Sequence, residues 1–457
     1  MSVPASPTPR RDAVVEGSGP AGRQAPDYRL HPALERLSGP SATLEIQARS
    51  RQLQAEGKPV FKLGLGQSPF PVPEPVVDAL RRHAADKDYL PVRGLPELRD
   101  RVAAFHAQSG AEGRCAEDVL IGPGSKELMF LLQLAFEGTT LIPSPAWVSY
   151  VPQALLTDRP IHRIETTFGE GWRLTPDRLD RACRQVAGPK LLILNYPGNP
   201  DGSTYGPEAL EALAEVARRH GVIVLSDEIY GPLQHDGRFV SIARDYPEGT
   251  VVSGGLSKWC GAGGWRLGTL CFPRGLAGLA DGVAIAASET FTSVSAPVQQ
   301  AAVTAYTPSD AIQTYVARSR AVVAELARDV TARLRDAGAR LVEPRGAFYV
   351  FADFTPCAEA LGSIDGPELA ERLLRQTGVA CLPGAAFGRP ASELTLRLSL
   401  VDFDGKAALE ALAAGQSVDR AFLQRCCAPV LQGVDRIAAF VKGRTGEGPS
   451  VSTRNGS

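Results

Sequence analysis

The chain has 457 residues and a formal net charge of −1, so it can build one large or two medium domains and lacks the basic excess expected for nucleic acid or membrane-surface partners. Hydrophobic residues make up 44% and charged residues 22%, as in ordinary globular proteins, and no apolar run approaches the roughly 20 residues that span a bilayer. The eight cysteines are scattered without a CxxC pair, which predicts reduced thiols in the cytoplasm, no disulfide scaffold and no metal site.

The two ends of the chain are polar and lack a periodic apolar pattern. Residues 1–27 are rich in Pro, Gly, Ser and Ala, and residues 443–457 form a second polar stretch. Segments of this composition bury too little apolar surface to order themselves, so we predict disordered tails at both ends.

The first informative site along the chain is Gly122–Lys126 (GPGSK). It follows a predicted strand at Val119–Ile121 and opens a predicted helix at Glu127–Phe136. Backbone N–H groups and a hydroxyl at a helix N-terminus suit an anion. Glycine-rich helix starts also occur without any ligand, so this stretch alone leaves both interpretations open.

A strand–helix–strand unit comes next. Lys190–Asn195 and Val222–Ser226 have the composition of buried strands, Pro207–His220 has apolar residues at helical spacing, and Thr250–Ser253 adds another strand. Buried strands joined by helices predict an α/β fold with a mostly parallel sheet between helices, in which ligands lie beyond the carboxyl ends of strands.

Polar and aromatic residues gather at those strand ends. Asp227 and Tyr230 lie in Ser226–Tyr230 (SDEIY), and Asn199 lies in the turn-rich loop Asn195–Tyr205. A carboxylate keeps a pyridine nitrogen protonated, and a phenol or amide donates to a ring hydroxyl. Trp147 is either a core aromatic or a ring stacked on a flat cofactor. Asn, Pro and Gly also make plain turns, which is the alternative for the loop.

The most informative segment is Ser253–Gly268 (SGGLSKWCGAGGWRLG), in which Lys258 follows a predicted strand and Arg266 follows a glycine-rich turn. A lysine amine is a covalent catalyst when it is held and partly desolvated, and the planar arginine fork suits a phosphate. A flexible glycine loop with two solvated cations is the alternative.

From about Pro308 the pattern changes to a smaller α+β unit. A long helix is predicted over Asp310–Ala337, followed by strands around Arg340–Val342, Ala347–Ala352 and Leu394–Leu400. Arg397 lies inside the last, apolar strand, where a charged side chain needs a partner. A substrate carboxylate and a structural salt bridge both satisfy that need.

Taken together and in this order, these stretches resemble the class I/II aminotransferases of the fold-type I pyridoxal-phosphate family. The resemblance covers about Leu63 to Leu400 and includes five further stretches: Gly64–Pro75, Tyr89–Leu98, Gly346–Tyr349 (GAFY), Pro383–Gly388 (PGAAFG) and the NPDG turn. It implies an N-terminal segment at 28–75 that joins the small domain, a large cofactor-binding domain at 76–307 and a small domain at 308–442.

The resemblance also implies pyridoxal 5′-phosphate as cofactor and assigns residues to it. Lys258 would carry it as a Schiff base and move a proton between the substrate Cα and the cofactor C4′. Asp227 would pair with the ring nitrogen, Tyr230 and Asn199 with the ring oxygen, and Trp147 would stack on the ring. The phosphate would be held by Ser125, Lys126, Ser257 and Arg266.

The implied partners are an L-amino acid and a 2-oxo acid. Arg397, with Asn199 and Gly66, would bind the substrate carboxylate. Family members usually form homodimers with shared active sites, so Tyr89 would reach the phosphate of the neighbouring subunit. The alternative reaction on this scaffold is β- or γ-elimination, replacement or carbon–carbon bond formation in specialised metabolism. S-adenosylmethionine is among the substrates that this alternative includes. An amino-acid-sensing regulator is disfavoured because no basic DNA-binding module precedes the domain.

The chain departs from the family pattern in four places. Gly255 stands where a serine is frequent, which predicts one fewer phosphate contact, and Asp201 adds a negative charge near the cofactor. Arg345 precedes GAFY, where a smaller or uncharged residue is usual. No arginine in Ala287–Pro297 is placed to receive a distal carboxylate, and Glu289 there is either a substrate contact or a solvated helix residue.

Overall fold

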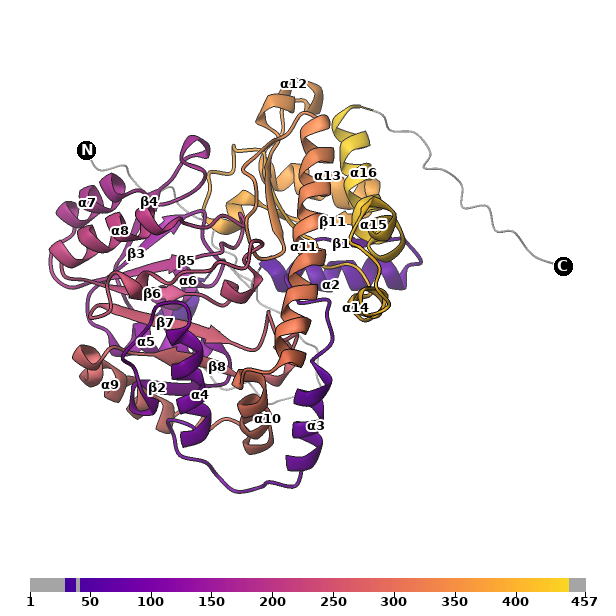
Figure 1. Ribbon diagram of the computed structural model, residues 1–457. Coiled ribbons are helices and arrows are strands. Elements are labelled where there is room, and N and C mark those ends of the chain that lie inside the picture. Colours follow the sequence, from indigo (N-terminus) through magenta and orange to yellow (C-terminus); the bar gives the residue numbers. More distant parts are fainter. Residues whose placement is uncertain (1–28, 38–41, 444–457) are drawn as a thin grey trace, which may run out of the picture.

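A computed structural model describes residues 29–37 and 42–443 of the chain (Figure 1). The predicted tail at 1–27 lies outside the described residues, as does all of the tail predicted at 443–457 except Gly443. No helix in the described ranges is long and apolar enough to cross a membrane.

The large sheet has seven strands in the order β2-β8-β7-β6-β5-β3-β4. Six of these strands run parallel, and β8 pairs antiparallel with both β2 and β7. The prediction of an α/β fold with a mostly parallel sheet is therefore confirmed. The strands are β2 (Val119–Gly122), β3 (Thr139–Ser144), β4 (Ile161–Glu165), β5 (Lys190–Asn195), β6 (Val222–Asp227), β7 (Thr250–Gly255) and β8 (Gly268–Cys271).

Apolar side chains on both faces explain why helices cover the large sheet on two sides. In β5, Leu191 and Ile193 pack on one face, and Leu192 and Leu194 pack on the other, as the two-residue period of a strand requires. One face is covered by α5 (Ser125–Ala135), α6 (Tyr150–Leu156) and α9 (Ala277–Ser288), and the other by α4 (Pro96–Ala107), α7 (Pro176–Gln185) and α8 (Pro207–Arg219).

The small sheet has four antiparallel strands in the order β12-β13-β10-β9. Its strands are β9 (Arg340–Leu341), β10 (Tyr349–Asp353), β12 (Leu382–Pro383) and β13 (Thr395–Ser399), and β1 (Phe61–Lys62) separately pairs with β11 (Val379–Ala380). The pairing of β1 with β11 joins the N-terminal segment to this part of the fold.

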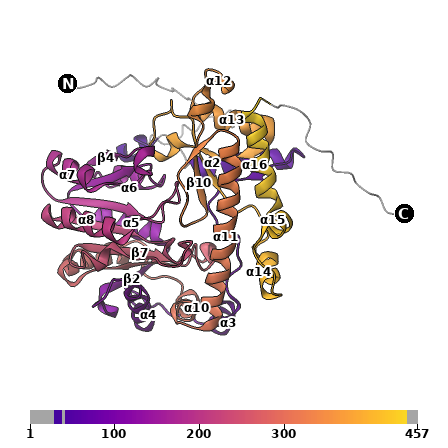
Figure 2. The ribbon, with the colours of Figure 1, turned by 45° about the horizontal axis from the view of Figure 1, so that its top comes forward.

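A long helix, α11 (Asp310–Asp336), links the two sheets. Figures 1 and 2 show it upright, with the large sheet to its left and α16 to its right. The predicted range Asp310–Ala337 is confirmed to within a residue. The remaining helices are α1 (Pro32–Glu35), α2 (Ala42–Ala55), α3 (Glu74–His83), α10 (Ala296–Tyr306), α12 (Ala358–Leu361), α13 (Gly366–Thr377), α14 (Gly405–Ala413), α15 (Arg420–Cys426) and α16 (Ala428–Val441).

The topology brings distant residues together at one edge of the large sheet. Asn195 and Asp227 are the last residues of neighbouring parallel strands, and they pair directly in the register of the sheet. Lys258 lies three residues past the end of the next strand, β7. Side chains far apart in sequence therefore converge beyond the carboxyl ends of β5, β6 and β7, as expected for such sheets.

Candidate active site

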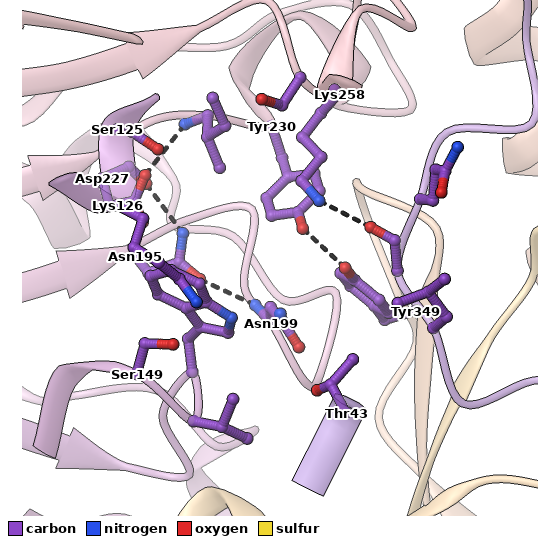
Figure 3. Close-up of a pocket in the computed structure, with 18 of the residues that line it drawn as sticks. Thr43, Ser125, Lys126, Ser149, Asn195, Asn199, Asp227, Tyr230, Lys258 and Tyr349 are labelled. Atoms are coloured by element: carbon purple, nitrogen blue, oxygen red, sulfur yellow. Dashed lines mark hydrogen bonds between the residues drawn. The ribbon is translucent and has the colours of Figure 1, made fainter. Parts of the chain in front are cut away.

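A cavity of about 460 Å³ lies at this edge, lined by residues of α2, of the large-sheet loops and of the small sheet. Eleven of the residues predicted for the site line it: Gly66, Ser125, Lys126, Trp147, Asn199, Asp227, Tyr230, Ser257, Lys258, Arg266 and Arg397. Figure 3 labels six of them around one space: Ser125, Lys126, Asn199, Asp227, Tyr230 and Lys258.

Lys258 is held from one side by a single backbone group. Its Nζ donates a hydrogen bond of 2.6 Å to the carbonyl oxygen of Gly66 (Figure 3). Burial, and then the charge of Arg397, lower the pKa of the amine to about 8, although Asp227 opposes the shift. Because the neutral amine is the nucleophile and the base, this environment prepares Lys258 for covalent and proton-transfer chemistry.

Asp227 is a buried carboxylate with several partners. Its Oδ2 accepts a hydrogen bond of 2.6 Å from the Tyr150 hydroxyl, and its Oδ1 accepts one of 3.3 Å from the backbone N–H of Ile229. The Asn195 side chain donates to the Asp227 carbonyl oxygen at 2.9 Å, which braces the backbone. Burial raises the pKa of Asp227 to about 6, while the Tyr150 hydrogen bond lowers it. A buried carboxylate of this kind is suited to a cationic nitrogen.

A second group of lining residues is suited to an anion. Ser125 is the first residue of α5, where unpaired N–H groups and the helix dipole favour negative charge. Lys126 and Arg266 add two cations, and burial followed by the charge of Arg266 lowers the pKa of Lys126. Gly124 has φ +96, and a Cβ there would lie 2.2 Å from Arg266 Nη2, so the arginine approaches the helix start only because this residue is glycine.

Arg397 is 2% exposed, and its Nη1 donates to Asn199 Oδ1 at 3.3 Å. Its Nη2 donates to the carbonyl oxygen of Gly64. Its Nε is buried without a hydrogen-bond partner, and no carboxylate in the described part of the chain forms an ion pair with it. The structural salt bridge considered from the sequence is therefore not formed by these residues, and burial without a counter-charge lowers the pKa of Arg397.

Two aromatic groups complete the lining. The hydroxyl groups of Tyr230 and Tyr349 share a hydrogen bond of 2.7 Å (Figure 3), and the Tyr349 ring lies 4.9 Å from the guanidinium carbon of Arg397. On the other side, the Trp147 ring lies 5.1 Å from Lys126 Nζ and packs edge-on against Tyr150. The cavity thus has one broad indole wall and one phenolic wall.

The remaining sequence predictions fall outside this cavity. Tyr89 is 90% exposed, so its role toward a neighbouring subunit stays a prediction. Asp201 does not line the cavity, contrary to the expectation of a charge near the cofactor. It is buried within its own loop, where its Oδ2 accepts from the Ser203 N–H at 3.3 Å and burial raises its pKa to about 6. Arg345 and Glu289 are exposed and do not line the cavity either.

The structure also explains one departure in the lysine loop. Gly255 has φ +154, and a Cβ there would lie 2.8 Å from the carbonyl oxygen of Leu267. A serine at this position would therefore collide with the backbone of the following loop.

Several lining residues were not predicted. Asn195 and Tyr349 lay inside stretches quoted for the resemblance and Tyr150 did not, and no single-residue signal indicated that any of the three points into the site. Thr43 and Leu44 of α2, together with Gln67, also line the cavity. Their contribution depends on how α2 packs, which no local pattern reveals.

The charged lining residues do not balance. Four are cations, Lys126, Lys258, Arg266 and Arg397, and one is an anion, Asp227. Buried charge without a counter-charge is unfavourable. The cavity therefore calls for a ligand, or a pair of ligands, with several negative charges.

Comparisons with known proteins find similar sequences and structures over most of the chain. The sequence profile of the family described as "Aminotransferase class I and II" matches residues 58–412. An aspartate/prephenate aminotransferase of Thermus thermophilus is 34% identical over 385 residues, which is 80% of this chain and 95% of that protein. An asparagine–oxo-acid transaminase of Streptococcus mutans is 31% identical over 361 residues, 77% of this chain and 90% of the relative. Among solved structures, an aspartate aminotransferase from Thermus thermophilus with maleate matches with a TM-score of 0.76 and 31% identity, covering 85% of this chain and all of that one.

Proposed function

The chain belongs to the class I and II aminotransferases, and we propose that the cavity around Lys258 is the site of its reaction. The protein is a pyridoxal-phosphate-dependent enzyme that moves an amino group between an L-amino acid and a 2-oxo acid. The relatives named above give no support to elimination or condensation, the alternative that the sequence left open.

The lining residues fit pyridoxal 5′-phosphate. The three positive charges of Lys126, Arg266 and Arg397 match a phosphate dianion together with one substrate carboxylate. We assign the phosphate to Ser125, Lys126, Ser257 and Arg266, because the first two begin α5, Arg266 approaches that helix start, and Ser257 lines the same cavity. When bound, the cofactor supplies an electron sink for the bonds around the substrate Cα.

The pyridine ring of the cofactor matches a second set of lining residues. We assign the ring nitrogen to Asp227. Burial destabilises the ionised form of this carboxylate, and a protonated ring nitrogen beside it would stabilise that form again. Tyr230 and Asn199 would donate to the ring oxygen, and the Trp147 indole would cover the ring face. Tyr150 and Asn195 hold Asp227 from behind through the contacts described above.

The reaction itself depends on Lys258 and Arg397. Arg397 binds the substrate carboxylate, since its guanidinium is buried and meets no carboxylate of its own chain in the described ranges. Lys258 Nζ would accept the proton from the Cα of the amino donor and, in the second half of the reaction, deliver a proton to the Cα that comes from the 2-oxo acid, because its pKa of about 8 allows both forms near neutral pH. The observation that carries the proposal is this one cavity, in which a partly neutral lysine, a buried aspartate and an unneutralised arginine face one another.

The test is a cofactor spectrum of the purified protein during addition of single L-amino acids without any 2-oxo acid. Aspartate and asparagine come first, because the named relatives act on them. Conversion of the cofactor to its amine form, with one equivalent of 2-oxo acid released, is the expected result. Release of other products, or a spectral shift that reverses without product, would favour elimination or condensation, and Lys258→Ala is the control.

We further propose a homodimer with shared active sites in the cytoplasm, divided into the segments 28–75, 76–307 and 308–442. Tyr89 is 90% exposed on a single chain, so its side chain is accessible to a neighbouring subunit. Mixing Tyr89→Ala and Lys258→Ala subunits tests it. Shared sites predict partial recovery of activity in mixed dimers, whereas independent sites predict none beyond the sum of the parents.

A further inference from the structure

A segment of the small-sheet region contacts the turn that leads to Trp147. The Ala146 N–H donates to the Phe387 carbonyl oxygen at 2.9 Å, and the Ser144 hydroxyl donates to the Gly388 carbonyl oxygen at 3.0 Å. We call residues 387–389 the clamp and residues 144–147 the indole turn. The indole turn begins at the end of β3, and Trp147 at its far end lines the cavity.

Arg389 is the charged residue of the clamp, and its side chain is only 9% exposed. Its Nη1 donates to the carbonyl oxygens of Ser144 at 3.4 Å and Thr166 at 3.1 Å. Glu393 pairs with the other two nitrogens, at 2.9 Å from Nε and 2.5 Å from Nη2. All three guanidinium nitrogens therefore have partners, and one of them is shared between two segments of the large-sheet region.

The Arg389 guanidinium also lies 4.9 Å from the centre of the buried Trp172 ring. Trp172 packs edge-on against Phe351 of β10, and Phe351 packs edge-on against Phe387. These aromatic contacts hold the clamp from a second direction.

The clamp reaches the other half of the site through Phe387. The centre of this buried ring lies 5.1 Å from the guanidinium carbon of Arg397. Two residues further along the chain, Arg389 donates a hydrogen bond to the Ser144 carbonyl oxygen of the indole turn. The clamp is therefore in contact with both the proposed substrate-carboxylate receptor and the residue proposed to cover the cofactor ring.

We propose that Arg389 is a positioning residue, which sets Trp147 and Arg397 at the spacing that the cofactor and the substrate require. The inference rests on the proposed function for the identity of the two ligands. The indole turn also leads into Tyr150, whose N–H donates to the Trp147 carbonyl oxygen at 3.2 Å. A shift of the turn would therefore displace the hydroxyl that holds Asp227.

The contacts at position 389 require the planar guanidinium group of an arginine. A guanidinium can bind a carboxylate with two nitrogens and still direct a third toward backbone carbonyls, whereas a lysine ammonium is a compact charge without that fixed geometry. Since misplacement by about 1 Å can cost a hundredfold in rate, loss of the fork is expected to affect binding and chemistry and not stability alone.

Arg340 provides a matched control. It pairs with Asp353, and its guanidinium lies 4.9 Å from the ring of Phe168, in the same loop as Trp172. The structure gives it no hydrogen bond to the indole turn within the described residues. Arg340→Met thus removes an ion pair within the small sheet and an aromatic contact to the large-sheet region, without touching the clamp.

The experiment compares Arg389→Met, Arg389→Lys and Arg340→Met as holoenzymes. For Arg389→Met we expect KM for the amino donor and the dissociation constant of pyridoxal phosphate to rise about tenfold or more, with a changed visible spectrum of the bound cofactor. Arg389→Lys should recover thermal stability but not KM. Arg340→Met should lose stability and leave KM and the spectrum unchanged.

A second readout does not depend on activity. Hydrogen exchange at residues 144–150 of the cofactor-free protein should accelerate in Arg389→Met and stay unchanged in Arg340→Met. If Arg389→Met and Arg340→Met lose stability equally while KM, spectrum and local exchange stay at wild-type values, the inference is wrong. If the exchange result holds but no amino acid converts the cofactor, the failure lies in the proposed function and not in the clamp.

Discussion

Replacing Tyr150 by Phe removes one hydroxyl group that the sequence did not identify. That hydroxyl donates to Asp227 Oδ2 at 2.6 Å, and both side chains are buried. The Ile229 N–H, 3.3 Å from Oδ1, remains as the other donor to the carboxylate. The variant therefore tests how strongly the Tyr150 hydroxyl alone stabilises the ionised form of Asp227.

The size of the effect follows from the partner's charge. A hydrogen bond to a charged group contributes about 1.5–3 kcal/mol, which corresponds to a pKa change of about one to two units. Burial has already raised the pKa of Asp227 to about 6 against an ordinary 3.8, and Tyr150 opposes that rise. Tyr150→Phe should therefore raise the pKa of Asp227 further.

The sign of the pH dependence follows by linkage. The folded state loses stability as pH rises from the unfolded pKa of 3.8 through the folded pKa of about 6, because the buried carboxyl must then ionise. In Tyr150→Phe the pKa of Asp227 in the folded state is higher, so the loss of stability with rising pH continues to a higher pH. The destabilisation caused by Tyr150→Phe should thus be larger at pH 8 than at pH 5, by about 1.5–3 kcal/mol.

Urea unfolding of the cofactor-free protein at these two pH values measures the difference directly. Tyr315→Phe is the matched control, because the Tyr315 hydroxyl donates to the neutral carbonyl oxygen of Pro71 at 2.9 Å. Its destabilisation should not depend on pH in this range. An equal destabilisation by Tyr150→Phe at both pH values would refute the reasoning, and affinity for pyridoxal phosphate should fall in parallel.

Three further predictions concern charged groups. Lys258→Ala should lower the rate of amino transfer by about a hundredfold or more while the protein still binds pyridoxal phosphate, as measured by turnover and by equilibrium dialysis; turnover near wild type would contradict its role. Glu228→Gln should stabilise the protein at pH 8 but not at pH 5, because burial raises the pKa of Glu228 to about 7 from 4.5, a displacement of about 3 kcal/mol; urea unfolding at both pH values checks the sign, and a variant less stable at pH 8 would be inconsistent with it. Arg397→Met should weaken amino-acid binding and raise the pKa of Lys258, since Arg397 now lowers it; the pH dependence of Lys258 modification in the cofactor-free protein measures the shift, and an unchanged or lower pKa would count against the electrostatic coupling.

Much of the fold could be predicted because the decisive patterns are local. The strand Lys190–Asn195 is apolar on both faces, so its burial between two helical layers follows from its own sequence. Pro207 near the helix start and Gly221 after its end mark the limits of α8 in the same way. The antiparallel β8 was missed because direction is set by the path of the chain after Arg266 and not by strand composition.

The residues of the candidate site likewise fall into those that local sequence could indicate and those that it could not. Lys258, Asp227 and Arg397 could be found because a charge next to, or inside, an apolar strand is a local anomaly. Tyr150 and Tyr349 are ordinary aromatic residues in the sequence, and their importance comes from hydroxyl groups that meet partners 77 and 119 residues away. Asp201 was misjudged for a related reason. Its neighbours suggested the cofactor site, but the loop turns its carboxylate toward the Ser203 N–H.

The charges around Lys258 also give the site an order of events. Burial is the largest cause of its low pKa, Arg397 is the next, and Asp227 acts in the opposite direction. A carboxylate paired with Arg397 cancels part of the guanidinium field, so the pKa of Lys258 rises when a substrate is in place. A more basic amine is a stronger proton acceptor. In the proposed site, pairing of Arg397 with the substrate carboxylate would therefore also raise the pKa of Lys258, so that the amine is more basic when a proton becomes available at the substrate Cα.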